Sequence, residues 1–273
     1  MKILIAADME GISGVVHWNH VDSQHPEYGR FRRIMTGDVN AAIRGAFDGG
    51  ADDVVVTDGH NFGRNILIEE LDSRARLNSG TPSLLGMVAG VDRGVDGVMF
   101  VGYHARIGAL NAILDHTWSD ERVANLWLGG RLVGESGLNG AVCGHFNVPV
   151  IMISGDQTVC AEARETLGDL ETAVVKQAAG RMAAECLPVT VAQQKIQEAA
   201  ARAARRLQSG QAPSPFKLAP PVTLSIDFVQ SEMADRAMIF PGAQRGPDRR
   251  IAYAAGDMLN AYLAFRTLVS LAR

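Results

Sequence analysis

Three short apolar runs in this chain each lead directly into an acidic or imidazole side chain. "ILIAA" precedes Asp8, "VVVT" precedes Asp58, and "VMFVGY" precedes His104. Nearly continuous apolar runs of this length predict β-strands that are covered on both faces, as in a parallel sheet. A chain that repeats this pattern must place helices on both sides of such a sheet.

Helical and strand-like segments alternate as far as residue 190. Residues 30–48 repeat apolar side chains at a helical period, and Gly49 and Gly50 then predict a helix end. Further helices are predicted for "SLLGMVAGV", "SGLNGAVCGHF" and "AEARETLG", strands for "VPVIMISGD" and "TAVVK", and a hairpin for "NLWLGGRLVGE". We therefore predict an α/β fold with a mostly parallel central sheet flanked by helices, and we place this first domain at residues 1–190.

The composition changes near residue 189. An Ala-rich, polar segment there predicts an amphipathic helix, and the proline-rich connector "QAPSPFKLAPP" follows it. "VTLSIDF", "MIFPG", "RIAYAA" and the helical "GDMLNAYLAFRTLVSLA" then predict a second set of strands and helices. We expect residues 191–273 to form a smaller C-terminal α+β subdomain.

Charge and hydropathy exclude several classes of partner. The net charge is −4 and no long basic run occurs, so neither nucleic acid nor an anionic membrane is expected as a partner. No segment reaches the ~18 apolar residues of a membrane span, and the first apolar run is too short for a signal peptide. Three cysteines without C-x-x-C spacing fit a reducing compartment, so we expect a cytoplasmic protein.

Five polar patches carry the chemistry: Asp8-Met9-Glu10, Asp58-Gly59-His60, Gly102-Tyr103-His104, Asp115-His116 and Gly134-Glu135. Ligands gather beyond the carboxyl ends of strands in sheets of this kind. Asp8 and Glu10 share one face of an extended segment, and two carboxylates held close repel one another unless a cation lies between them. Carboxylates together with imidazoles bind zinc-like ions, so the patches predict a metallohydrolase with residues 1–190 as its metal-binding catalytic domain.

Each patch also has a simpler interpretation. Asp8 could order a loop, and His60 or His104 could be a hydrogen-bonded histidine without a metal. Glu135 could be a charge favoured by the start of a helix, and His116 could lie in a surface loop. The motifs G-x-S-x-G, H-E-x-x-H, the P-loop and G-x-G-x-x-G are all absent, so these other catalytic and cofactor sites are not indicated.

Taken in order, "AADMEGISG", "VTDGHN", "VGYHA", "DHTWS" and "VGESGLNG" resemble the M55 peptidase family, the D-aminopeptidases of the dipeptide-transport (DppA) type. The resemblance continues through "VVKQAAGR" and "MADRAMIFPG". It implies two zinc ions per subunit, a catalytic histidine, and a homo-oligomer, described for the family as a decameric ring. The implied zinc ligands are Asp8 as the bridge, Glu10 and His60 for one ion, and His104 and Glu135 for the other; the implied catalytic residue is His116.

We therefore expect an aminopeptidase that releases N-terminal amino acids, with D-residues preferred, from short peptides or amides. One alternative is another dinuclear hydrolase, an amidase or a phosphoesterase; only Arg106 offers a basic side chain inside a patch for phosphate chemistry. A second alternative is a metal-binding oligomer without activity. The same ligands also accept manganese or cobalt. Three aspartates are candidate partners for the substrate's α-amine: Asp58, Asp115 and Asp156.

Overall fold

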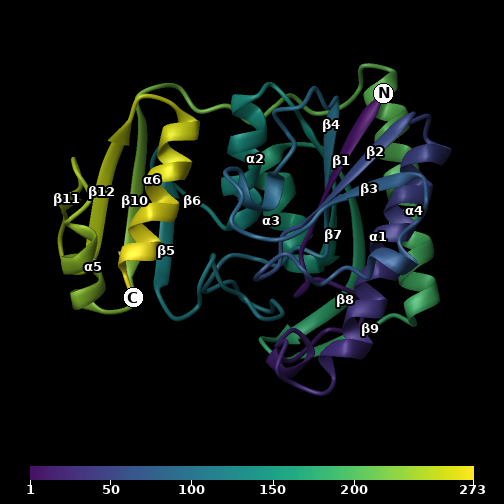
Figure 1. Ribbon diagram of the computed structural model, residues 1–273, viewed down its shortest axis with the longest axis horizontal. Coiled ribbons are helices and arrows are strands. Elements are labelled where there is room, and N and C mark those ends of the chain that lie inside the picture. The colour runs from purple at the N-terminus through teal and green to yellow at the C-terminus, as the bar shows by residue number, and fades with distance from the viewer.

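The computed structural model describes residues 1–273 and contains two separate β-sheets (Figure 1). The larger sheet has the strand order β3-β2-β1-β4-β7-β8-β9, and only its last strand is antiparallel to its neighbour. Its strands are β1 (Lys2–Ala7), β2 (Asp53–Asp58), β3 (Ala75–Asn78), β4 (Gly97–Val101), β7 (Val150–Asp156), β8 (Glu171–Gly180) and β9 (Ala183–Cys186). The central strands β4 and β7 are buried along their whole length, as their apolar sequences predict.

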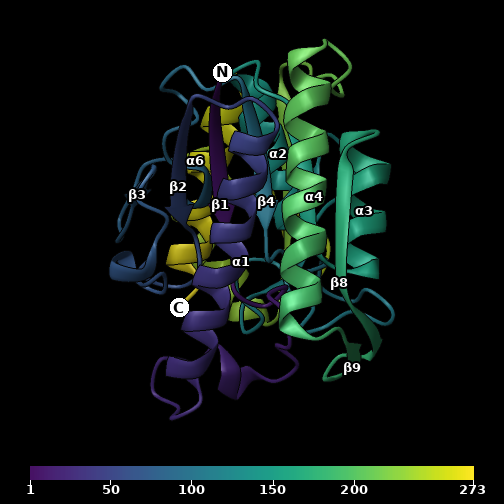
Figure 2. The same ribbon diagram turned by 90° about the vertical axis from the view of Figure 1, so that its right-hand side faces the viewer.

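Helices cover both faces of this sheet. One face carries α1 (Tyr28–Asp48) and α4 (Val189–Gln208), which lie side by side in Figure 2. The other face carries α2 (Glu135–His145) and α3 (Gln157–Leu167). The two long helices approach closely because Gly45 of α1 and Gly49, which caps its C-terminal end, face the backbone of α4, where a β-carbon would collide.

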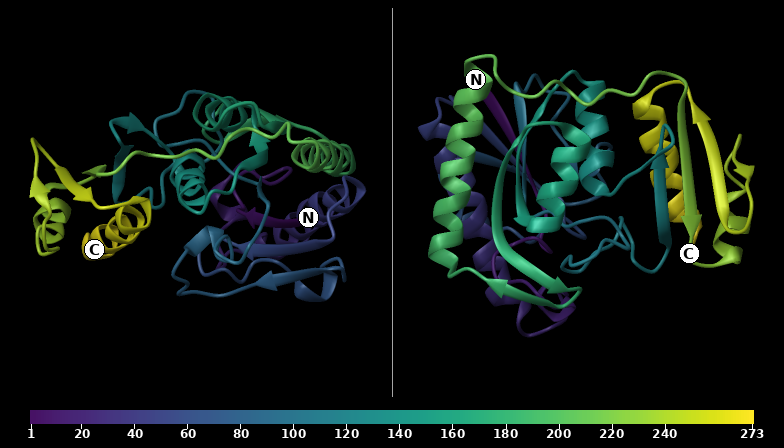
Figure 3. Two further views of the ribbon diagram at one scale, coloured as in Figure 1. Left: turned by 90° about the horizontal axis from the view of Figure 1, so that it is seen from above. Right: turned by 180° about the vertical axis from the view of Figure 1, so that it is seen from behind.

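The smaller sheet is antiparallel, with the strand order β11-β12-β10-β5-β6. Exposed or half-exposed and buried side chains alternate along its central strand β10, as expected for a sheet with one covered face. Its elements are β5 (Val123–Leu128), β6 (Arg131–Leu132), β10 (Val222–Phe228), α5 (Ser231–Ala237), β11 (Gln244–Arg245), β12 (Arg250–Ala255) and α6 (Met258–Leu271). Figure 3 shows the chain after α4 crossing the molecule to reach this sheet.

The predicted fold class is confirmed, but the division between the two sheets does not coincide with the expected boundary at residue 190. The hairpin β5–β6 belongs to the smaller sheet, because β5 pairs with β10. Helix α4 packs on α1 and on the larger sheet, because its Ala-rich apolar face is covered there. Whether either part folds alone stays a prediction.

Three local expectations differ from the structure. "SLLGMVAGV" forms only the short 3-10 helix η3 (Gly86–Val88), because Gly86 and Gly90 both have positive φ angles that interrupt an α-helix. "MIFPG" is not a strand, since it directly follows the unanticipated helix α5. The edge strand β3 was also not anticipated, because its polar sequence lacks an apolar run. Two further 3-10 helices are η1 (Trp18–His20) and η2 (Ile68–Glu70).

The register of the parallel strands brings the polar patches together. Ala7 at the end of β1 pairs with Asp58 of β2 on one side and with Val101 of β4 on the other. The loops that leave these three strands therefore start side by side at one edge of the sheet. No helix in the structure combines the length and the apolar character needed to cross a bilayer.

Candidate metal centre

Direct backbone hydrogen bonds join the loops at this edge. The amide of Asp8 donates to Val101 O, that of Gly59 to Ala7 O, and that of Gly11 to Gly102 O, each at 2.8 Å. A β-carbon on Gly11 would collide with the carbonyl oxygen of Tyr103, so this contact requires glycine. The side chains that these loops carry are therefore held within a few ångströms of one another.

At one end of the cluster, two side chains from the loop after β1 meet a side chain from the loop after β2. His60 Nδ1 lies 3.4 Å from Asp8 Oδ1 and 3.2 Å from Glu10 Oε2. Asp8 and Glu10 are 3% and 2% exposed. The Asp8-x-Glu10 spacing thus places both carboxylates against a single imidazole.

At the other end of the cluster, a side chain from the loop after β4 meets the first residue of α2. His104 Nε2 lies 3.5 Å from Asp8 Oδ2 and 3.1 Å from Glu135 Oε1. Glu135 is the first residue of α2, and its Oε1 also accepts a hydrogen bond from Trp118 N at 2.8 Å. Because the two oxygens of Asp8 face different histidines, this carboxylate lies between the two ends of the cluster.

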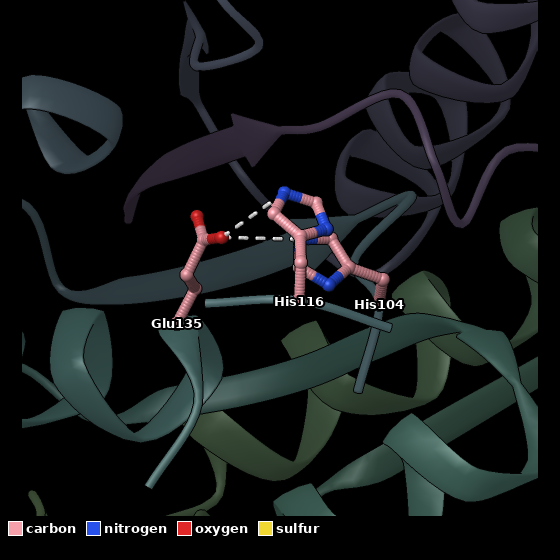
Figure 4. Close-up of side chains that lie close together, drawn as sticks. All are labelled: His104, His116 and Glu135. Carbon is pink, nitrogen blue, oxygen red and sulfur yellow. Dashed lines mark ion pairs between the residues drawn. The ribbon is translucent and has the colours of Figure 1, made fainter. Parts of the chain in front are cut away.

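His116 lies beside His104 and Glu135 (Figure 4). Its ring stacks on the ring of His104, with centroids 3.9 Å apart and planes 9° apart, and its Nε2 is 3.7 Å from Glu135 Oε1. The edge of Trp18 covers it at a centroid distance of 5.5 Å. The histidine is buried, which differs from the interpretation of a surface loop residue.

Backbone carbonyls fix the orientation of all three rings. His60 Nε2 lies 3.1 Å from Val21 O, His104 Nδ1 lies 3.0 Å from Ala105 O, and His116 Nδ1 lies 2.8 Å from Leu114 O. A carbonyl oxygen can only accept, so each of these nitrogens donates a proton. The other nitrogen of each ring then faces the cluster, which is the arrangement of metal-binding histidines.

The donor set fits metal ions. Glu10 Oε2 and His104 Nε2 are buried without a hydrogen bond, which is unfavourable unless a cation satisfies them. Ligands of a tetrahedral zinc ion with bonds of about 2.1 Å are about 3.4 Å apart, close to the separations within the cluster. The cluster contains two triplets of donor atoms, and within each triplet all atoms lie within 4.8 Å of one another. One triplet comes from Asp8, Glu10 and His104, and the other from His104, His116 and Glu135.

Burial and mutual charge shift the protonation of the cluster. Burial, together with the charge of Glu10, raises the pKa of Asp8 to about 7. Burial disfavours the charged form of His104, but Glu135 and Asp8 outweigh it and raise the pKa of His104 to about 10. Burial and the neighbouring His104 lower the pKa of His116. Zinc ligands bind deprotonated, so loading this cluster with metal releases protons.

The three other aspartates predicted near the site are engaged elsewhere. Asp58 accepts from the amides of Asn65 and Ile66, at 2.6 and 2.8 Å, so it organises the loop after His60 instead of orienting an imidazole. Asp115 pairs with Arg181 at 3.0 Å and accepts from Gly108 N. Asp156 caps α3. These hydrogen bonds disfavour all three as partners of a substrate amine.

Two residues that contact the site were not anticipated. Trp18 covers His116, and Lys176 of β8 donates to the backbone carbonyl of Glu10. A lysine inside the otherwise apolar strand "TAVVK" was the available signal, because a buried ammonium needs specific partners. Trp18 begins the short 3-10 helix η1, in a connection whose path the sequence pattern does not define.

Comparisons with known proteins place this geometry in context. A model of the M55 peptidase family, described as D-aminopeptidase, matches residues 1–267. A D-aminopeptidase of Bacillus subtilis (strain 168) is 37% identical over 273 residues, which is 100% of this chain and 98% of the relative. The structure of the Zn-dependent D-aminopeptidase DppA from Bacillus subtilis, described as a self-compartmentalizing protease, matches with a TM-score of 0.95 at 36% identity, over 100% of this chain and 98% of that chain. The similarity therefore includes both sheets.

Proposed function

Because the chain belongs to the M55 peptidase family of D-aminopeptidases, we propose that it is a zinc-dependent aminopeptidase that releases N-terminal D-amino acids from short peptides. The observation that carries this proposal is the group of carboxylates and imidazoles that meet beyond the carboxyl ends of β1, β2 and β4, all of them buried except the half-buried His60. A buried cluster of this kind, with unsatisfied donors aimed inward, is typical of a metal centre.

We assign two zinc ions to each subunit. Asp8 would be a ligand shared by the two ions, because its two oxygens face His60 and His104 respectively. Glu10 and His60 complete one set of ligands, and His104 and Glu135 complete the other. When bound, the ions supply Lewis acidity, which lowers the pKa of a water nucleophile and polarises the scissile carbonyl.

His116 is the catalytic residue in this proposal. The Nδ1–H of His116 donates a hydrogen bond to Leu114 O, so Nε2 presents a free lone pair to the cluster. A neutral imidazole held in this way can take a proton from the attacking water and return it to the leaving amine. Trp18 and His104 pack on the ring and keep it in this position.

We further propose a cytoplasmic homo-oligomer, a decameric ring, that takes short peptides. The neighbouring structure is of a protease described as self-compartmentalizing, which supports a closed assembly for a chain that matches it over 100% of its length. Enclosure would restrict access to small or extended substrates. The net charge of −4 favours neither nucleic acid nor an anionic membrane as a partner.

A phosphoesterase is less well supported than a peptidase. Phosphate groups are usually neutralised by arginine or lysine next to the metals. Every ion pair made by Asp8, Glu10 or Glu135 is with a histidine. The guanidinium of Arg106 donates to Ile107 O in its own loop.

The deciding experiment measures metal and stereochemistry on one sample. The protein is assayed against matched D- and L-alanine amides and a phosphoester, and its zinc content per chain is determined. We expect two zinc ions, hydrolysis of the D-amide in preference to the L-amide, loss of activity with a chelator and recovery with zinc. Hydrolysis of the phosphoester alone, or amide hydrolysis that a chelator does not affect, would contradict the proposal.

A further inference from the structure

Lys176 is a buried ammonium whose partners are all backbone carbonyls. It lies in β8 and is 1% exposed. Its Nζ donates to Glu10 O at 2.7 Å, Ile12 O at 2.9 Å and Val15 O at 2.7 Å. An ammonium has three protons, so all of them are used. None of the ion pairs in the structure includes this lysine.

The three carbonyls belong to the irregular loop between β1 and η1, which carries Glu10. Further contacts hold this loop: Gly11 N donates to Gly102 O, and both Ser13 N and Ser13 Oγ donate to Asp38 Oδ2. The carbonyls of residues 10, 12 and 15 converge on one point because the loop coils around the ammonium. Without a donor there, three buried carbonyls would be left unsatisfied, which is strongly unfavourable.

We propose that Lys176 is a positioning residue for one half of the metal centre. It holds the backbone of Glu10, and that backbone sets where Glu10 Oε2 lies, 3.2 Å from His60 Nδ1. This inference rests on the proposed assignment of Glu10 and His60 as ligands of one zinc ion. It adds that Lys176 sets the ligand geometry already in the metal-free protein, although its strand β8 is separated from β1 by β4 and β7.

The effect is confined to one half of the centre. His104 follows β4 and Glu135 begins α2, and Lys176 donates to neither residue nor to its neighbours. Loss of the lysine therefore weakens the ion held by Glu10 and His60 and leaves the ion held by His104 and Glu135 bound. A general loss of stability would weaken both.

The first test is zinc titration of Lys176→Met, which keeps the chain's bulk and removes the donors, and of Lys176→Gln, which keeps two donors. We expect Lys176→Met to bind one zinc ion with unchanged affinity and the other at least ~10-fold more weakly, with Lys176→Gln between it and the wild type. Excess zinc should restore kcat. Lys195→Met on the exposed face of α4 controls for lost charge, and Ile226→Ala in β10 for lost stability.

The second test uses the wild-type protein and does not depend on activity or on a variant that folds. Hydrogen exchange of the amides of Gly11 and Ser13 is measured before and after zinc removal with a chelator. If the lysine holds the loop, both amides stay protected in the metal-free protein.

Unprotected amides after chelation would mean that the metal, not Lys176, orders the loop. Equal weakening of both zinc ions in Lys176→Met, or no weakening of either, would also overturn the inference. A wild-type protein that binds no zinc would instead refute the proposed function, while the exchange experiment would still test the loop.

Discussion

The two sheets of this protein are built from similar apolar strands, yet most residues of the candidate centre follow strands of only one of them. In the larger sheet β1, β2 and β4 run parallel, so their carboxyl ends lie at one edge. In the smaller sheet neighbouring strands run antiparallel, so successive loops leave from opposite ends. Asp8, Glu10, His60 and His104 follow strands of the larger sheet, whereas His116 lies in the connection from β4 to β5 and Glu135 follows β6 of the smaller sheet at the start of α2.

The smaller sheet supports the centre from outside. Tyr262 Oη of α6 donates to Leu85 O at 3.2 Å, and Arg266 Nη1 donates to Ser83 O at 2.6 Å. The ring of Trp118 packs edge-on against Phe265, while the amide of Trp118 donates to Glu135. Parallel strand ends thus concentrate function, and the antiparallel sheet provides a rigid surface for the loops to rest on.

The largest effect that would sharpen this contrast is expected for Asp8→Asn. Replacing the proposed bridge by a neutral amide should lower kcat/KM at least about a thousandfold and reduce the zinc content, because several kcal/mol of metal-derived stabilisation are lost. The matched control is Asp227→Asn, which breaks an ion pair with Arg250 in the smaller sheet and should leave both quantities unchanged. Two bound zinc ions and a wild-type rate in Asp8→Asn would remove the contrast.

The next largest effect concerns His116. His116→Ala should lower kcat by about 10²- to 10⁴-fold, the range for loss of a proton-transfer group, and should keep both zinc ions. Steady-state kinetics and metal analysis on the same preparation decide this. His145→Ala at the end of α2 is the control and should have no effect. If His116→Ala loses zinc and the missing rate returns with added zinc, the residue is a ligand and not the catalytic group.

A substitution in the smaller sheet should separate stability from chemistry. Phe228 of β10 is fully buried, so Phe228→Ala should lower the free energy of unfolding by about 3–5 kcal/mol. Zinc content and kcat of the folded protein should stay unchanged, because the side chain touches no residue of the centre. Urea unfolding and kinetics at a temperature where the variant is folded measure both. A tenfold fall in kcat would show that the smaller sheet does more than support the loops.

The smallest effect tests a buried carboxylate beneath the loops of the larger sheet. Burial raises the pKa of Asp38 well above its ordinary value, to about 6. The folded state therefore holds this proton more tightly, and the resulting stability is present below about pH 4 and is lost as the pH rises through 6. Asp38→Asn cannot lose a proton, so its stability relative to the wild type should increase by about 1–3 kcal/mol between pH 4 and pH 7. Urea unfolding of both proteins across this range measures the difference, and parallel curves would contradict the pKa shift.

Much of this organisation could be predicted from the sequence. Nearly continuous apolar runs identified β1, β2, β4 and β7, and the polar residues after them identified the edge where the centre lies. The order of the short motifs also predicted the family. Local signals suffice here because a strand's burial and the residue that follows it are both encoded within about ten positions.

Other features could not be predicted because they depend on distant partners. Asp58 looked equivalent to Asp8, but the loop folds back so that Asn65 and Ile66 donate to it. The hairpin β5–β6 looked like part of the first domain, but its pairing partner β10 lies nearly a hundred residues further along the chain. Neither outcome leaves a local signal.

The sequence by itself determined which segments are buried strands, which ligand types follow them and which family the chain resembles, since periodicity and motifs are local properties. Only the tertiary structure decided that Asp8 lies between two histidines, that β5 joins the smaller sheet and that Lys176 reaches the loop of Glu10. The physical reason is that parallel register and the satisfaction of buried polar groups are settled between segments as far as 177 residues apart.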